Sequence, residues 1–201
     1  MDQVKQDLAR RLTAEYGSME SFFGSEGVSV EPLSTPFISG GGIFKVTNRG
    51  PRVEKISYVG WSGRDFAVFL SGSQSAFTKL LQTVKVQLPS DDVRVAYVGT
   101  MLETMANLNF RFQLLKLSDE IPNRPQSTSD ETARIAAVRL RFAAIANGAK
   151  IQSLNGSWRV TFHALIAQDL VRVDVDVNQD GSFLLEKTVL EKDLAMPYIM
   201  G

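Results

Sequence analysis

The stretch that decides the fold runs from Ser157 to Glu191 and reads SWRVTFHALIAQDLVRVDVDVNQDGSFLLEKTVLE. Valines occupy every second position from Val171 to Val177, and charged residues stand between them. The run from Trp158 to Ile166 alternates in the same way. Strict alternation predicts strands with one buried face and one face in water. We therefore expect this stretch to form an antiparallel meander of three strands.

The turn after Val177 sets the register of the last hairpin. A two-residue loop would place the valine face opposite a glutamate and bury a charge. A three-residue loop that ends at Gly181, in the left-handed conformation of a G1 bulge, instead places Val177 opposite Phe183 and Val175 opposite Leu185. Because a slip of one residue inverts every side chain, we predict this second register.

The same matching of faces places His163, the only histidine in the chain, opposite Asp174 on the solvent-facing side of the sheet. A carboxylate beside an imidazole fixes its tautomer and raises its basicity, as a general base requires. The candidate catalytic residues on this face are His163, Asp174, Asp176 and Arg159. Ordinary cross-strand pairing on a wet sheet face explains the same pattern without catalysis. Since no further ligand has the spacing of a metal motif, we predict neither a metal nor a cofactor.

Composition predicts one soluble domain over residues 1–201. The chain is 44% hydrophobic, which is enough to bury a core, and it has no cysteine for disulfides or thiolate chemistry. Residues 118–129 contain two prolines and many small polar residues, so a division of the chain, if there is one, is expected there.

The 22 basic and 22 acidic residues cancel, so no overall field attracts the chain to nucleic acid or to a charged membrane. No run reaches the roughly 18–20 apolar residues of a membrane span. The first 16 residues have a helical pattern without the apolar core of a signal peptide. These features predict a cytoplasmic protein without a membrane partner.

The remaining periodicities predict an α+β fold. β-branched and aromatic residues between turn signals indicate a second antiparallel three-stranded meander over about 43–70. Apolar residues at helical spacing indicate helices over about 2–16, 74–88, 91–105 and 130–147. Residues 90–106 also alternate as a strand would, but the serine and two aspartates at their start favour a helix. Residue identities do not repeat between the two meanders, so we infer no duplication.

Basic and aromatic residues are interleaved between residues 43 and 66, as on a platform for single-stranded nucleic acid. We expect Trp61 in a turn at Gly60–Gly63, where tryptophan and arginine favour interfaces. The candidate binding residues are Trp61, Arg64, Arg52 and Lys55. A solvated sheet face with ordinary aromatic residues explains the composition equally well, and the balanced overall charge argues against nucleic acid.

These observations favour a non-catalytic protein-binding or assembly module, with a protein partner or a homo-oligomer. The alternative is a small-molecule enzyme or carrier with a sheet-lined pocket, in which His163 and Asp174 form the general base pair. A third hypothesis is single-stranded nucleic-acid binding through the sheet over residues 43–66.

Overall fold

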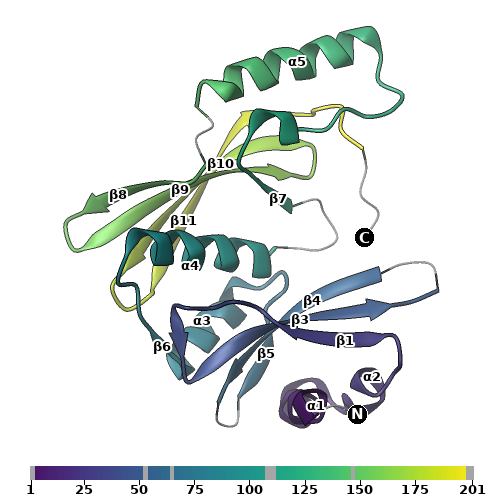
Figure 1. Cartoon of the computed structure of the whole chain (residues 1–201), viewed down its shortest axis with the longest axis vertical. Coiled ribbons are helices and arrows are strands. Elements are labelled where there is room, and N and C mark those ends of the chain that lie inside the picture. The colour runs from purple at the N-terminus through teal and green to yellow at the C-terminus, as the bar shows by residue number, and fades with distance from the viewer. Residues whose placement is uncertain (1–2, 52–53, 64–65, 107–111, 146–147, 198–201) are drawn as a thin grey trace. The chain divides into compact units, whose positions relative to one another are not determined.

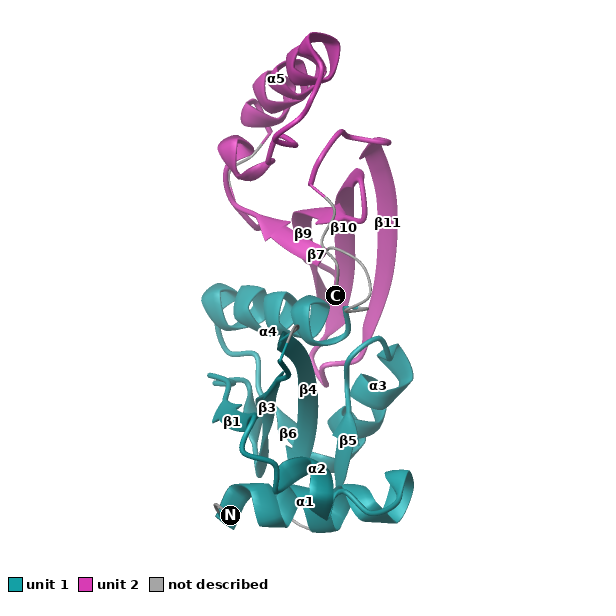
Figure 2. Ribbon diagram, turned by 90° about the vertical axis from the view of Figure 1, so that its right-hand side faces the viewer, with its two compact units in different colours: residues 1–108, 201 teal, residues 109–200 magenta. Residues whose placement is uncertain are grey.

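The computed structural model describes residues 3–51, 54–63, 66–106, 112–145 and 148–197 (Figure 1). The chain divides into two compact units, residues 1–108 and residues 109–200 (Figure 2). Helices and antiparallel sheets make up both, which confirms the α+β class. Among the described residues, no helix is both long enough and apolar enough to cross a membrane. That the chain is a single domain stays a prediction.

Unit 1 contains a four-stranded antiparallel sheet in the order β1-β3-β4-β5, and a separate pair of short strands, β2 and β6. Its elements, in chain order, are α1 (Gln3–Tyr16), α2 (Glu20–Phe23), β1 (Val28–Pro32), β2 (Ile38–Ser39), β3 (Gly41–Arg49), β4 (Glu54–Ser62), β5 (Ala67–Phe69), α3 (Gln74–Thr83), β6 (Lys85–Val86) and α4 (Asp91–Thr104).

Helix α1 buries its apolar stripe against one face of this sheet. Leu8 and Leu12 pack there on Val46 and Val59 of the central strands. Helix α3 lies so close to the opposite face that a Cβ at Gly60 of β4 would come within 2.6 Å of Leu80. The core of unit 1 therefore has a helix on each side of a thin sheet.

Unit 2 is built on the predicted meander. Its elements are β7 (Phe112–Leu115), a 3₁₀ turn (Ser118–Glu120), α5 (Ser129–Ala143), β8 (Lys150–Leu154), β9 (Ser157–Ile166), β10 (Asp169–Asn178) and β11 (Phe183–Glu191). The strand order is β11-β10-β9-β7, and β8 pairs with the other end of β9. Thr128 and Glu131 form the capping box at the start of α5.

The core of unit 2 lies between α5 and one end of the sheet. Ile135, Val138 and Phe142 of α5 pack on Leu165 of β9 and Leu170 of β10. On the other face of the sheet, the alternating valines of β10 are buried, as their pattern predicts. The last hairpin has the predicted register.

That register is visible in the backbone of the β10–β11 turn. Gly181 has a φ of 84° and donates to Asn178, and Asn178 donates to Ser182 across a three-residue loop. Val177 then pairs with Phe183. The prediction of a G1 bulge at Gly181 is confirmed.

The helix predicted over 91–105 is confirmed as α4, and Ser90 caps it by accepting from the backbone of Val93. The helix predicted over 74–88 ends earlier, at Thr83, because Val84 is extended and Lys85–Val86 pairs with β2. A strand partner 46 to 48 residues away thus overrides the local helical spacing. Strands β1 and β8 were not predicted.

Candidate functional site

The hairpin between β9 and β10 is tighter than the sequence predicts. Only Ala167 and Gln168 separate the strands, and Ala167 has a φ of 54°, where non-glycine residues are strained. The C-terminal segment holds this turn: the amide of Leu194 donates to the Gln168 carbonyl at 2.8 Å and that of Met196 to its side chain at 3.2 Å. These long-range bonds explain a turn that the local sequence does not specify.

The tighter turn shifts the register by two residues, so every side chain keeps its face but changes its partner. His163 is not opposite Asp174, and that prediction was wrong. The residues that pair across β9 and β10 on this face are His163 with Arg172, Thr161 with Asp174, and Arg159 with Asp176.

Asp174 is 8% exposed, and both oxygens of its carboxylate are hydrogen-bonded. Thr161 donates its hydroxyl to one oxygen at 2.6 Å, and the Arg172 guanidinium donates to the other at 2.9 Å. Arg172 also reaches Thr188 of β11 at 3.4 Å. Asp174 therefore links β9 to Arg172, and Arg172 extends these contacts to β11.

Asp176 and Arg159 form a two-pronged pair, with both nitrogen-to-oxygen distances at 2.7 Å. Their mutual hydrogen bonds lower the pKa of Asp176 and raise the pKa of Arg159. The carboxylate is held ionised and the guanidinium charged, so the pair behaves as a fixed cross-strand link.

His163 is 5% exposed, although the alternation predicted a wet face at this position. Phe142 of α5 covers it, with ring centres 5.0 Å apart in an edge-to-face arrangement. Burial is the largest cause of a lowered pKa for His163, followed by the charges of Lys150 and Arg172, and the opposing effect of Asp174 is smaller. The ring is therefore neutral at pH 7.

All four candidate catalytic residues lie on this face, in three cross-strand pairs at alternate positions of β9 and β10. A neutral buried imidazole can accept a proton, but its lowered pKa makes it a weaker base than an exposed histidine. Within the described residues, no three His, Asp or Glu side chains converge as a metal site would require. The catalytic role of His163, Asp174, Asp176 and Arg159 stays a prediction.

Of the candidate binding residues of unit 1, the structure describes Trp61 and Lys55, which lie far apart along one strand. Trp61 lies inside β4, so the predicted turn at Gly60–Gly63 was wrong, and its ring packs on Phe44. Lys55 is exposed near the start of the same strand, and six strand residues separate their Cα atoms by about 20 Å. Arg52 and Arg64 lie outside the described residues.

Arg11 of α1, which sequence reasoning missed, stacks over Trp61 with its guanidinium carbon 5.4 Å from the ring centre. Three buried donors there, Nε and Nη1 of Arg11 and Nε1 of Trp61, have no hydrogen-bond partner in the part of the chain that the structure describes. An apolar cavity of about 60 Å³ adjoins the ring. Tyr58 of β4 instead bonds to Glu103 of α4, so the aromatic residues do not form one platform.

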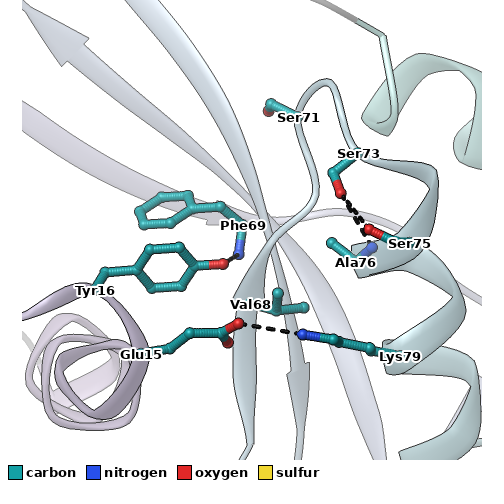
Figure 3. A pocket seen from close by; sticks show the side chains of 9 residues that line it. All are labelled: Glu15, Tyr16, Val68, Phe69, Ser71, Ser73, Ser75, Ala76 and Lys79. Atoms are coloured by element: carbon teal, nitrogen blue, oxygen red, sulfur yellow. Dashed lines mark hydrogen bonds and ion pairs between the residues drawn. The ribbon is translucent and has the colours of Figure 1, made fainter.

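A larger cavity of about 310 Å³, also within unit 1, is lined by both polar and apolar groups (Figure 3). The end of α1, strand β5 and the start of α3 surround it. Lys79 and Glu15 form an ion pair across it at 3.3 Å. Its lining residues are Glu15, Tyr16, Val68, Phe69, Ser71, Ser73, Ser75, Ala76 and Lys79. The sequence feature that could have indicated this cavity is the run of serines at alternate positions 71, 73 and 75.

The fold and these sites define an α+β protein in which each unit contains an antiparallel meander. The chain matches no protein-family model, no curated protein and no solved structure.

Proposed function

We propose that the protein is a protein-binding module that takes up an extended segment of a partner protein along the free edge of β11. Within the described residues, this nine-residue strand pairs with β10 alone. A strand with an unpaired edge offers backbone donors and acceptors to an added strand, a recurrent mode of peptide recognition. This long unpaired edge is the observation that carries the proposal.

The bulged turn determines which backbone groups of β11 face outward. Asn178 and Ser182 form a hydrogen-bonded pair, and such pairs alternate with non-bonded pairs along an antiparallel ladder. Leu185, Lys187 and Val189 fall in the non-bonded pairs. Their amide and carbonyl groups therefore point away from β10, toward the position of an added strand.

Two apolar side chains on β11 are unusually open to water. Leu184 is 71% exposed and Val189 is 44% exposed. Leu184 pairs with Asp176 and Val189 pairs with Val171, so they lie on opposite faces of the sheet. Side chains on one face of an added strand would cover Leu184, and those on its other face would cover Val189. That burial would stabilise the complex in addition to the backbone hydrogen bonds.

The charges at the middle of β11 disfavour pairing with a second copy. A symmetric antiparallel pair that overlaps the whole strand places Lys187 opposite Lys187, and the next register in one direction places Glu186 opposite Glu186. Like charges directly opposite each other destabilise a sheet, and an edge lysine discourages self-association. These two registers favour a different chain as the partner, with an acidic residue opposite Lys187.

The test uses the full chain, with a photo-crosslinking residue at position 184, expressed in cells of its natural host. Lys187→Pro removes an outward N–H but no bond to β10, as edge strands tolerate, whereas Lys187→Ala keeps that N–H. We expect a crosslinked partner that is lost with Lys187→Pro and kept with Lys187→Ala. Leu184→Asp gives a second variant, with the crosslinker moved to position 189.

A crosslinker at the exposed Leu140 of α5 is the control for nonspecific capture. Melting curves of both Lys187 variants show whether they are folded. Three results would overturn the proposal: no adduct specific to position 184, an adduct unaffected by Lys187→Pro and Leu184→Asp, or an adduct with a second copy of this chain.

A further inference from the structure

We propose that the larger cavity of unit 1 binds a small anion of the phosphate class, either inorganic phosphate or the end of a phosphate monoester (Figure 3). Lys79 supplies the positive charge, and the hydroxyls of Tyr16, Ser71 and Ser73 donate hydrogen bonds. This inference is independent of the proposed edge-strand function, because all the residues involved belong to unit 1.

The hydroxyl groups around the cavity are set up as donors. The oxygen of Tyr16 accepts the amide of Phe69 at 3.4 Å, and the oxygen of Ser71 accepts the amide of Tyr58 at 2.9 Å. Ser73 accepts the amide of Ala76 as the cap of α3, and it shares a hydrogen bond of 3.1 Å with Ser75, in which either hydroxyl can be the donor, so that one proton of the pair is left for a ligand. An oxygen that already accepts a backbone N–H has its own proton left to donate. Partial burial raises the pKa of Tyr16, so its phenol keeps that proton at neutral pH.

The charges around the cavity favour an anion. Lys79 is the cation and Glu15 the one carboxylate among the lining residues, and their side chains are both roughly half exposed. An exposed pair of this kind contributes little stability, so a ligand can compete for Lys79. No acidic residue stands in the first turn of α3, which begins at the cavity. Donors thus outnumber acceptors, and a neutral ligand would leave most of them unused.

The shape of the cavity favours a tetrahedral ligand. Its donors come from the end of α1, from the turn after β5 and from α3, so they approach from different directions. A tetrahedral oxyanion accepts from several sides, whereas a carboxylate is planar. A volume of about 310 Å³ lies at the lower end of the range for small-molecule sites, about 300–1,000 Å³. A phosphate group with a short organic substituent matches that size.

Titration of the full chain at low ionic strength, followed by amide NMR shifts and calorimetry, tests this inference. The probes are inorganic phosphate, glycerol phosphate, sulfate and acetate. We expect the phosphates to shift the amides of residues 71–79 and to bind more tightly than acetate. Lys79→Met should weaken binding about tenfold or more, the usual scale for a charged hydrogen bond.

Glu15→Gln gives the sharper result, because it frees Lys79 from its counter-ion and should strengthen phosphate binding several-fold. Ser71→Ala and Tyr16→Phe should each weaken binding. The matched controls are Glu54→Gln, which removes the carboxylate of the exposed Arg49–Glu54 pair, and Lys55→Met, and both should leave the affinity unchanged within about twofold.

Two outcomes would overturn the inference. One is the absence of any phosphate-dependent shift in both the wild type and Glu15→Gln. The other is an equal loss of affinity in Lys55→Met and Lys79→Met, which would show nonspecific attraction to lysines. A preference for glycerol phosphate over inorganic phosphate identifies a monoester as the ligand, and the reverse preference identifies the free ion.

Discussion

The two units share an order of elements that their residues do not reveal. In unit 1, α1 precedes the antiparallel strands β1, β3, β4 and β5, each paired with the next. In unit 2, α5 precedes β8, β9, β10 and β11, paired in the same succession. In both, the helix before the meander packs on the sheet that follows it. One succession of elements can therefore be encoded by two unrelated residue patterns.

The units differ in how they accommodate a basic group beneath that helix. In unit 1, α1 itself contributes Arg11, whose guanidinium lies over the Trp61 ring. In unit 2, Phe142 of α5 covers His163, whose lowered pKa lets it lose its charge. The difference teaches that a buried basic group is accommodated in two ways: a histidine loses its charge, whereas an arginine lies against an aromatic face.

The largest expected effect tests whether the two units depend on each other. Phe142→Ala removes a buried ring of unit 2 and should lower its free energy of unfolding by about 3–5 kcal/mol. Each unit contains one of the two tryptophans, Trp61 in unit 1 and Trp158 in unit 2. Replacing either with phenylalanine makes denaturant-induced unfolding report on the other unit alone.

If the units unfold independently, the Trp158 signal shifts to lower denaturant and the Trp61 signal does not. If they unfold as one cooperative domain, both signals shift together. Leu140→Ala, at an exposed position of the same helix, is the control and should change little. A loss of less than about 1 kcal/mol for Phe142→Ala would contradict the packing described for α5.

Much of the fold was predictable because its information is local. Alternation defined β9 and β10 of unit 2, and the bulge at Gly181 fixed the last hairpin, since only one loop length kept a glutamate out of the valine face. The caps at Ser90 and Thr128 were equally local. The end of α3 could not be predicted locally, because it depends on the pairing of β6 with β2.

The candidate site was predictable in its residues but not in its pairs. Face alternation placed His163 and Asp174 on one side of the sheet, and a shift of two residues preserves that result. The partners depended on the turn at Ala167, which the amides of Leu194 and Met196 hold from far along the chain. Burial of His163 depended likewise on where α5 docks, which periodicity does not specify.

The second-largest expected effect is a pH dependence of the stability of unit 2. The contribution of His163 to this dependence should be absent in His163→Gln. His163 titrates near its ordinary pKa of 6.5 when unfolded and below it when folded. Between those two pKa values the unfolded chain binds more protons than the folded one. The stability of unit 2 is therefore highest above about pH 6.5 and falls as the pH is lowered. The slope from one group is at most about 1.4 kcal/mol per pH unit.

Free energies of unfolding at pH 5 to 8, read from Trp158, measure this dependence. The difference between the wild type and His163→Gln isolates the histidine, because every carboxylate is common to both. We expect the wild type to lose more stability than the variant as the pH falls from 7 to 5. Parallel curves would mean that the folded imidazole titrates as it does in the unfolded chain.

The smallest effect concerns Arg11, and it sharpens the contrast with His163. Arg11→Met removes two buried donors without an acceptor among the described residues, which stabilises by up to about 1–3 kcal/mol, and also a cation–π contact worth about 0.5–2 kcal/mol. Methionine retains the apolar contact with Trp61. The opposing contributions should leave stability within about 1 kcal/mol of the wild type. Arg10→Met, at the exposed neighbouring position, controls for the loss of one charge from α1.

A loss of more than about 2 kcal/mol for Arg11→Met alone would show that its buried nitrogens have an acceptor in the folded protein. The guanidinium would then be a paired structural cation, and the contrast between the units would reduce to the titration of His163.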